Sequence, residues 1–181
     1  MKINNKTVLA ILGLISIATI VIALIVFDTR SETENILREY TCPLQEDFVI
    51  TSPFGYRWGE FHAGIDLSGI ELYGSNVYAI AKGVVVRTVV DDDVWGNYVI
   101  VRHENNLYSL YAHLSDIIVR ERQNINLSEI IGNVGNSGSV VPRPTTESPM
   151  RGTHLHFGLF RDGYSQNENA INPVLKMSCF N

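Results

Sequence analysis

The sequence is short of cysteine and of positive charge. Its 181 residues include two cysteines, Cys42 and Cys179, and 14 basic against 19 acidic side chains, which gives a net charge of −5. Proteins that bind nucleic acid rely on clustered lysine and arginine to neutralise phosphates. The acidic balance therefore argues against a nucleic-acid partner. The two cysteines lack the CxxC spacing of structural zinc sites, so they predict no metal centre of that kind.

Long amphipathic helix patterns and internal repeats are also missing after residue 27. Instead, short runs rich in β-branched and aromatic residues alternate with Gly, Asn and Asp, a pattern typical of strands and turns. Strands are expected at 48–51, 76–81, 83–90, 97–102, 107–112, 117–120, 130–134 and 154–160, with a hairpin loop at 91–96 and a short turn at 173–177. The pattern predicts an all-β domain, an antiparallel β-sandwich or open barrel of short strands.

One hydrophobic run stands apart from the rest of the chain. Val8–Phe27 contains twenty residues without a charge, which is the length that an α-helix needs to cross the hydrocarbon core of a membrane. Lys2 and Lys6 precede it, and this favours a cytoplasmic N-terminus. A cleavable signal peptide is the alternative, but such peptides end in small residues, whereas this run ends in Ile25-Val26-Phe27. We therefore expect one N-terminal transmembrane helix that leaves the rest of the chain on the outer, periplasmic or extracellular, side of the cytoplasmic membrane.

The expected domain organisation follows from this run. Residues 1–7 would be the cytoplasmic N-terminus, 8–27 the transmembrane anchor, 28–40 a polar stalk and 41–181 the globular domain. Beyond residue 27 the chain carries 12 basic and 19 acidic side chains, a net charge of −7. Cys42 and Cys179 stand at the two ends of this domain. Because the termini of compact domains often lie close together and exported chains meet oxidising conditions, a disulfide is favoured over two free buried thiols.

The segment Thr153–Phe157 carries two histidines separated by one leucine. Side chains on a strand alternate between its two faces, so His154 and His156 would share one face while Leu155 and Phe157 point to the other. Two imidazoles on one face suit a metal site, with one binding the ion and the other beside it. Two solvent-facing histidines are the alternative interpretation.

His62 and Asp66 are candidates for the remaining metal ligands. On an extended strand they would lie about 13 Å apart, too far to share an ion. Gly64 lies between them and permits a bend that brings the imidazole and the carboxylate together. Two histidines and one carboxylate form a known catalytic zinc set that leaves a position for water. The alternative is a loop histidine beside a solvated aspartate.

His113 belongs to a third run, Tyr108–Leu114. Alternation along this run places His113 at a strand end, where functional residues of small β folds tend to emerge. A lone histidine there is more often structural. Its occurrence in one domain with the other two histidine motifs favours a shared site.

These segments together resemble the lysostaphin-type (LytM-like) zinc endopeptidases, which cut peptide cross-links of bacterial peptidoglycan. The resemblance covers about Val49 to Leu175. It rests on an ordered series of segments: TSPFGYRW at 51–58, HAGID at 62–66, AKGVVV at 81–86, GNYVIVRH at 96–103, YAHLS at 111–115, GNVGNSG at 132–138, THLHF at 153–157 and INPVLKM at 171–177.

The resemblance implies specific roles for individual residues. His62, Asp66 and His156 would bind Zn2+, and His113 and His154 would be the catalytic histidines. Tyr56 resembles a tyrosine that some members place over the reacting carbonyl. His103 recurs in the family's strand and is interpreted as structural. The implied function is a membrane-anchored zinc metalloendopeptidase that hydrolyses stem peptides or cross-links of peptidoglycan with zinc-activated water.

The alternative is a non-catalytic relative that binds the cell wall and regulates other hydrolases. Such relatives typically lack metal ligands, and none is missing here. The sequence departs from the family at Ser139–Gly152, a segment with three prolines where members commonly have a shorter connection. It would form a rim of the substrate cleft, a lid or a partner contact, or else a tolerated surface insertion. The sequence indicates no particular protein regulator.

Overall fold

The computed structural model describes residues 19–22, 40–164 and 167–180. The chain divides after Glu39 into two units. In the first, the described residues 19–22 are helical. Within the described part of the chain, no helix is both long and apolar enough to cross a membrane. Apart from residues 19–22 and Tyr40, the expected membrane span at 8–27 and the expected stalk at 28–40 lie outside the described residues, so both stay predictions.

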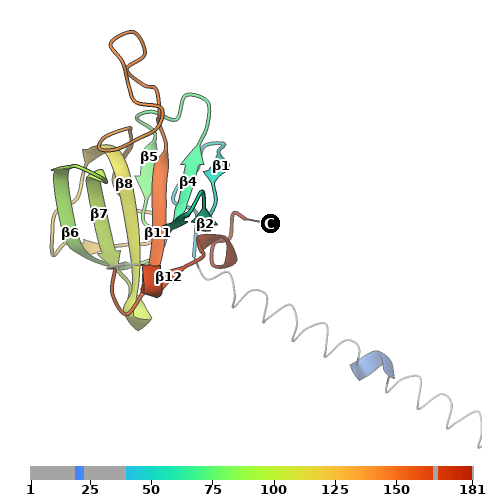
Figure 1. Ribbon diagram of the computed structural model, residues 1–181. Helices are drawn as coiled ribbons and strands as arrows, with labels where there is room; N and C mark the ends of the chain where they lie inside the picture. Colours follow the sequence, from blue (N-terminus) through green and yellow to red (C-terminus); the bar gives the residue numbers. More distant parts are fainter. Residues whose placement is uncertain (1–18, 23–39, 165–166, 181) are drawn as a thin grey trace, which may run out of the picture. The chain divides into compact units, whose positions relative to one another are not determined.

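The second unit, Tyr40–Asn181, consists mainly of antiparallel strands, which confirms the all-β prediction (Figure 1). Seven of the strands form the main path of a sheet in the order β1-β4-β11-β8-β7-β6-β9. The strands are β1 (Val49–Ser52), β2 (Gly55–Arg57), β3 (Glu60–His62), β4 (Ile65–Ser68), β5 (Asn76–Tyr78), β6 (Gly83–Asp92), β7 (Gly96–Arg102), β8 (Leu107–Ile117), β9 (Asn124–Ile125), β10 (Ile130–Val134), β11 (Leu155–Arg161) and β12 (Ala170–Ile171). Three short 3-10 turns complete it: η1 (Glu104–Asn106), η2 (Asn167–Asn169) and η3 (Pro173–Leu175).

Strands β8 and β11 lie at the centre of the sheet and carry much of the core. Leu155, Phe157 and Leu159 of β11 are fully buried, and the Phe157 ring packs against Tyr111 of β8 with the ring centroids 5.3 Å apart. Burying such side chains stabilises the fold by about 1.5–3 kcal/mol each. The apolar face of β11 therefore fixes the strand, so that its opposite face can carry polar side chains in defined positions.

Strand β8 changes partner along its length. Its first part pairs with β7 and β11, whereas Asp116 and Ile117 pair with β10. Leu114 pairs with both β7 and β10. His113 stands at the change with a φ of 62°, a left-handed conformation that L-residues seldom adopt. Its backbone N–H still donates to the Trp95 carbonyl at 2.9 Å. The strand therefore continues past His113, and the prediction that this histidine ends a strand was wrong, because a local kink replaces the end.

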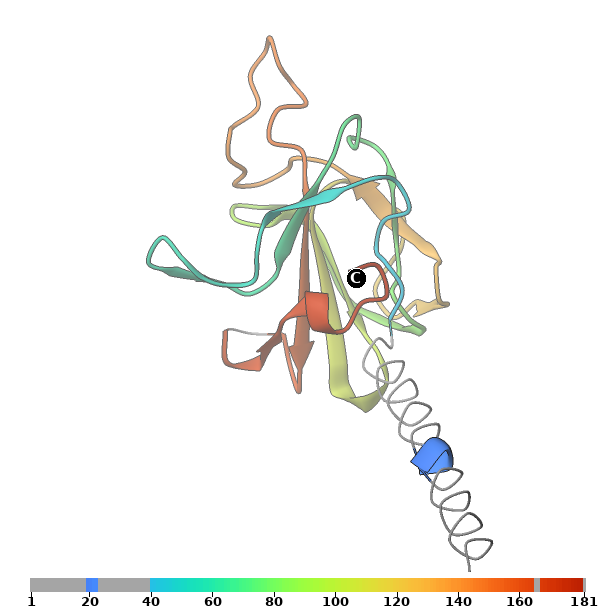
Figure 2. The same ribbon diagram turned by 90° about the vertical axis from the view of Figure 1, so that its right-hand side faces the viewer.

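The hairpin of β2 and β3 forms a separate two-stranded sheet that extends away from the main sheet (Figure 2). Its turn residues Trp58 and Gly59 have φ values of 51° and 89°. Positive φ at both central residues of a two-residue turn suits the right-handed twist of a hairpin. After β3 the chain bends at residues 63–64 and enters β4. The bend predicted at Gly64 is thus present.

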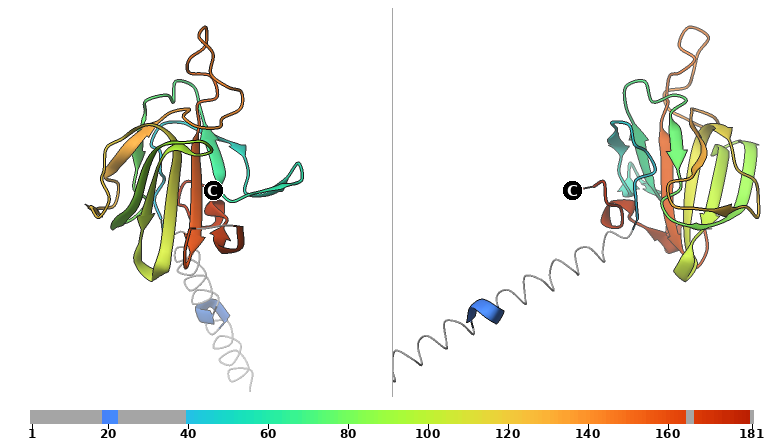
Figure 3. Two further views of the ribbon diagram at one scale, coloured as in Figure 1. Left: turned by 60° about the vertical axis from the view of Figure 1, so that its left-hand side comes forward. Right: turned by 180° about the vertical axis from the view of Figure 1, so that it is seen from behind.

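The two ends of this unit lie together. A disulfide joins Cys42 and Cys179, whose Cα atoms are 5.7 Å apart, and Tyr40 forms a β-bridge with Met177. The predicted pairing of the two cysteines is confirmed. The 139–152 loop extends from the opposite end of the sheet, where β11 begins (Figure 3).

Several strand predictions need correction. No strand covers residues 118–120, because β8 ends at Ile117 and the chain turns between Arg120 and Gln123, whose backbone groups hydrogen-bond. The strand expected at 76–81 ends at Tyr78. The hairpin loop expected at 91–96 is present but shorter, at 93–95, because β6 continues through Asp92 and β7 begins at Gly96. The turn at Pro173 is confirmed. The short strands β2, β3, β4, β9 and β12 were not predicted.

Candidate metal centre

Three side chains predicted as ligands meet where β3, β4 and β11 adjoin. Asp66 of β4 and His156 of β11 are opposite one another in the antiparallel register. His62 ends β3, and the bend after it turns the chain back so that its ring approaches the same point. Residues 90 positions apart are thus neighbours because the strands that carry them pair.

The ligand atoms of this group are close together. His156 Nδ1 lies 2.9 Å from Asp66 Oδ1 and 3.0 Å from His62 Nε2, and His62 Nε2 lies 3.2 Å from Asp66 Oδ1. His62 and His156 are buried, and Asp66 is half-buried. His62 Nδ1 is 2.9 Å from the Pro53 carbonyl oxygen. Since a carbonyl only accepts, Nδ1 carries the proton, and the lone pair of Nε2 points at the other two ligand atoms.

These residues fit a zinc ion. Two atoms that both lie about 2.0–2.1 Å from a tetrahedral ion are roughly 3.3 Å apart, close to the three separations found here. The donor set of two imidazoles and one carboxylate is a catalytic one, and the hydrogen bond to Pro53 orients His62 as outer partners of metal-bound histidines do. Among the described residues, this is also the group of histidine and acidic side chains whose ligand atoms converge to within 4.8 Å.

The acid–base properties of the group suit metal binding. Although burial raises the pKa of Asp66, the adjacent imidazoles of His156 and His62 outweigh it and hold the pKa well below the ordinary value. Burial lowers the pKa of His156. The carboxylate is therefore ionised and the imidazole neutral near pH 7, which are the forms that bind metal ions.

His113 and His154 lie beside this group. Their ring centroids are 4.6 Å apart, and His154 Nε2 is 3.9 Å from Asp66 Oδ1. His113 Nδ1 donates to the Ser137 carbonyl and His154 Nδ1 to the Gly152 carbonyl, both at 2.8 Å. Each ring therefore keeps an unprotonated Nε2 as an acceptor. Burial and the neighbouring His154 lower the pKa of His113 to about 4.

All five of these side chains line one cleft of about 640 Å³, here called the metal-site cleft. The 139–152 loop contributes Ser139, Val141, Pro142 and Gly152 to its wall. The Asn136 side-chain amide donates hydrogen bonds to the backbone carbonyls of Pro149 and Arg151, and these bonds hold the C-terminal end of the loop in place. The loop is thus a rim of the cleft, which is one of the roles expected for it.

Tyr56 differs from the other predicted site residues. Its side chain is 85% exposed, packs edge-on against Phe61 at 5.1 Å, and is not among the residues that line the metal-site cleft. Its neighbours on the hairpin, Arg57 and Trp58, do line the cleft. Alternation along β2 accounts for the difference between Tyr56 and Arg57, because adjacent side chains of a strand point to opposite faces. Trp58 lies in the turn after β2, where this alternation ends. A role of Tyr56 over the reacting group stays a prediction.

Arg57 is the site residue that the sequence reasoning missed. Its Nη2 lies 3.8 Å from Asp66 Oδ2, and its guanidinium lies over the Trp58 ring at 5.1 Å. The only available signal was its place in the TSPFGYRW segment, nine residues before Asp66. Nothing in that spacing predicts the hairpin that folds Arg57 back toward the ligand.

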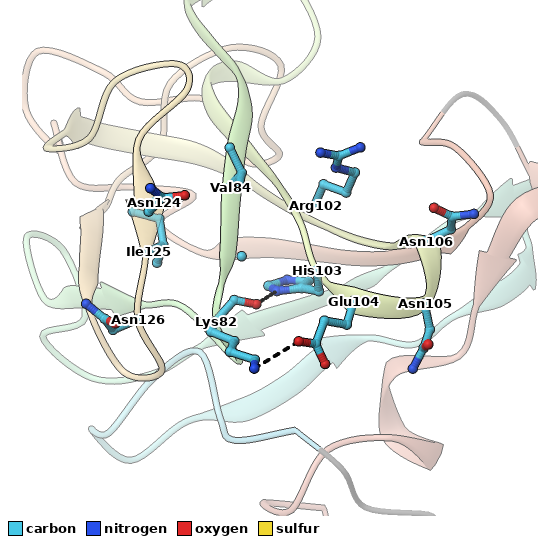
Figure 4. A pocket seen from close by; sticks show the side chains of 11 residues that line it. Lys82, Val84, Arg102, His103, Glu104, Asn105, Asn106, Asn124, Ile125 and Asn126 are labelled. Atoms are coloured by element: carbon cyan, nitrogen blue, oxygen red, sulfur yellow. Dashed lines mark hydrogen bonds and ion pairs between the residues drawn. The ribbon is translucent and has the colours of Figure 1, made fainter.

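His103 is remote from this cleft and is held by other groups. Its Nδ1 donates to the Lys82 carbonyl at 2.9 Å, and its Nε2 is 2.7 Å from Ser109 Oγ. It borders a second hollow of about 520 Å³ beside the ion pair of Lys82 and Glu104 (Figure 4). Both ring nitrogens therefore have partners, in agreement with the structural interpretation of His103.

Comparison with known proteins places this fold and site in context. The model of peptidase family M23 matches residues 60–173. The chain is 36% identical to the DD-carboxypeptidase/endopeptidase Mpg of Neisseria meningitidis serogroup B over 69% of its own length and 26% of that protein. It is 35% identical to the peptidoglycan DD-endopeptidase ShyA of Vibrio cholerae serotype O1 over 58% of its length and 22% of that protein. The chain thus spans about a quarter of the length of these relatives.

Two further comparisons bear on fold and activity. The catalytic domain of the prophage-encoded M23 protein EnpA from Enterococcus faecalis, solved as a mutant, is 26% identical with a TM-score of 0.59, over 74% of this chain and 94% of that one. The murein hydrolase activator NlpD of Salmonella dublin is 31% identical over 58% of this chain and 24% of that protein. The similarity therefore extends to a regulator as well as to enzymes. On the family match over residues 60–173, together with the fold and the ligand group, the chain belongs to peptidase family M23, of the LytM-like type.

Proposed function

We propose that this chain is a zinc metalloendopeptidase that hydrolyses peptide cross-links of bacterial peptidoglycan. The observation that carries the proposal is the convergence of a complete ligand group and two acceptor histidines on one cleft. The relatives named as DD-endopeptidases support peptidoglycan as the substrate, and favour a bond between two D-configured residues.

The roles of the residues follow from their contacts. His62, Asp66 and His156 would hold the ion, and a zinc ion held there supplies Lewis acidity toward a peptide carbonyl and toward water. His113 and His154 present unprotonated Nε2 atoms to the same cleft. One accepts a proton from the attacking water and the other, once protonated, donates to the leaving amine. The carbonyls of Ser137 and Gly152 orient both rings for this exchange.

The setting of the enzyme is part of the proposal. The apolar run Val8–Phe27 supports a single-pass anchor in the cytoplasmic membrane, with the domain on the outer side. The disulfide between Cys42 and Cys179 suits an oxidising compartment outside the cytoplasm. Peptidoglycan lies in that compartment, so anchor and substrate would be within reach of each other.

A non-catalytic regulator of other hydrolases is the second candidate, and the likeness to NlpD favours it. The complete ligand group favours the enzyme, because a binding module has no need of convergent ligands beside two acceptor histidines. The two functions differ in a simple way. Only the enzyme creates new peptide ends by itself.

The test is metal content together with digestion of purified peptidoglycan by the purified chain, with the products identified by mass spectrometry. We expect one zinc per chain and new peptide ends that disappear when the metal is removed by a chelator. His156→Ala should lose both zinc and cleavage. His113→Ala should keep zinc and lose about 10²- to 10⁴-fold in rate, the usual contribution of a general base. Cleavage that survives His156→Ala, or a chain without zinc and without cleavage, would refute the proposal.

A further inference from the structure

Arg57 supplies the positive charge of the metal-site cleft. Among the described residues that line the cleft, Arg57 is the only lysine or arginine and Asp66 the only acidic side chain. Arg57 belongs to the β2–β3 hairpin rather than to the main sheet. Its position is nevertheless defined, because its guanidinium lies over the Trp58 ring at 5.1 Å. A stacked guanidinium of this kind keeps its N–H edge available to a ligand.

The hydrogen-bonding capacity of Arg57 is largely unused. A guanidinium has five N–H donors. In the described part of the chain its ion-pair partner is Asp66 Oδ2, and the separation of 3.8 Å is longer than a hydrogen bond. Its Nε is buried and has no hydrogen-bond partner among the residues that the structure describes. Because Nε is not accessible from the cleft, a ligand would accept from the Nη groups, which make no hydrogen bond to the described residues.

Asp66 does not satisfy the hydrogen-bond donors of the Arg57 guanidinium. Its Oδ1 is already within 2.9 Å of His156 Nδ1 and 3.2 Å of His62 Nε2. The carboxylate is thus directed toward the ligand group, and only its second oxygen faces the arginine. The planar fork of Arg57 remains free for an anion of matching geometry, and a carboxylate is such an anion because it accepts two parallel N–H bonds.

The chemistry of the substrate indicates where that carboxylate comes from. In a bond between two D-residues of which the second keeps a free α-carboxyl, the nitrogen of the scissile amide is attached to a carbon that carries a carboxylate, and the carboxylate carbon is three bonds from the scissile carbonyl carbon. An oligoglycine bridge has no carboxylate next to its internal bonds. Because Arg57 adjoins Asp66, a carboxylate at three bonds from the reacting carbon is within its reach.

We propose that Arg57 binds the α-carboxylate of the residue that leaves in the reaction, and so selects substrates that carry a free carboxylate beside the scissile bond. This inference rests on the proposed hydrolase function. It assigns to Arg57 a role in substrate specificity that the metal ligands and the two acceptor histidines do not supply.

The test compares two peptides that end in D-Ala-D-Ala, one as the free acid and one as the C-terminal amide. The wild-type chain should cleave the free acid with a kcat/KM about 10- to 100-fold higher, as expected for a charge-assisted bidentate contact. In Arg57→Gln the preference should disappear, and in Arg57→Lys it should be partly retained. Arg143→Gln, which removes a charge from the 139–152 loop outside the cleft lining, is the matched control and should keep the wild-type preference.

Two further measurements separate the possible failures. Zinc content should be the same in Arg57→Gln and wild type, and chelator-treated wild type should bind the free acid more tightly than the amide in calorimetry, in an Arg57-dependent way. A wild-type chain that cleaves both peptides equally overturns the inference and leaves the hydrolase function standing. Equal losses on both peptides in Arg57→Gln, or loss of zinc, also overturn it, since Arg57 would then only position Asp66. Arg57-dependent binding of the acid without cleavage of either peptide or of cross-linked peptidoglycan upholds the inference and overturns the hydrolase function.

Discussion

Backbone carbonyls determine the chemistry of the histidines in this domain. The chain has five histidines, and four of them, His62, His103, His113 and His154, donate Nδ1–H to a backbone carbonyl oxygen. Each of the four therefore presents a lone pair at Nε2. His156 is the exception, because its Nδ1 faces Asp66 and His62. Because of this difference, the proposed ligand group combines Nε2 of His62 with Nδ1 of His156.

His103 provides a pH dependence that is separate from the metal. Burial lowers its pKa below the ordinary value of 6.5. As the pH falls below about 6.5, His103 becomes protonated in the unfolded chain while it stays neutral in the folded chain. The free energy of unfolding therefore decreases. We expect urea unfolding of the chelator-treated protein to show lower stability at pH 5.5 than at pH 7.5, with a smaller difference in His103→Gln. Equal pH dependence in both proteins would contradict this assignment.

At the level of single residues, the sequence could predict ligands but not outer partners. His62, Asp66, His154 and His156 were predicted from their spacing and from the resemblance, and the structure brings them together. The carbonyls of Pro53, Ser137 and Gly152 have no signature in the sequence, since every residue carries one. Arg57 was missed for a related reason, because its role depends on a hairpin turn at Trp58-Gly59 that lacks the usual Asn-Gly or Asp-Gly signal.

The bend between β3 and β4 is the element that completes the ligand group. A Cβ added at Gly64 would lie 2.6 Å from the Phe157 carbonyl oxygen and 2.8 Å from His156 Nε2. Contacts under 3.0 Å force a neighbour to move, and here the neighbour is a predicted ligand. We expect Gly64→Ala to weaken zinc binding at least about tenfold, a shift of about 1.4 kcal/mol, as measured by competition with a chromogenic chelator.

Gly69→Ala is the matched control for this change. Its Cβ would meet the Asp47 carbonyl oxygen at 2.5 Å, a similar clash with backbone, but no ligand is among the nearest atoms. Gly69→Ala should therefore lose stability and keep its zinc affinity. If both variants bound zinc as tightly as the wild type, the bend would not be what positions His156.

Element prediction succeeded where packing follows the hydrophobic pattern. In β11, alternation correctly assigned Leu155 and Phe157 to the core and His156 to the opposite face. It failed at β8, because a single residue with positive φ, His113, allows one strand to continue into a second pairing. Periodicity describes the faces of a strand, and it contains no information about which partner the strand meets.

At the scale of the whole domain, the disulfide closes nearly the entire fold. Cys42 and Cys179 are 137 residues apart, and a cross-link over so long a loop restricts the unfolded chain by about 4–5 kcal/mol in the chain-entropy model. We expect the double variant Cys42→Ser and Cys179→Ser to lose up to this much in the free energy of unfolding, measured by urea denaturation.

The metal site should be affected far less than the stability, because neither cysteine lines the metal-site cleft. The double variant, at temperatures where it is folded, should bind zinc like the wild type. A reducing agent should destabilise the wild type and leave the double variant unchanged. Equal stability of the two proteins under oxidising conditions would show that the bridge adds nothing to this fold.

The register of β4 against β11 also orders events in time. Asp66 and His156 are opposite each other only after segments 90 residues apart have paired. A nascent chain that exposes only His62 and Asp66 holds two of the three proposed ligands and would not retain an ion as the complete group would. Under the proposed zinc assignment, metal loading would therefore be a late step of biogenesis, after synthesis of the His156 segment and its docking on the sheet, and a chain stalled before that point would lack the complete ligand group.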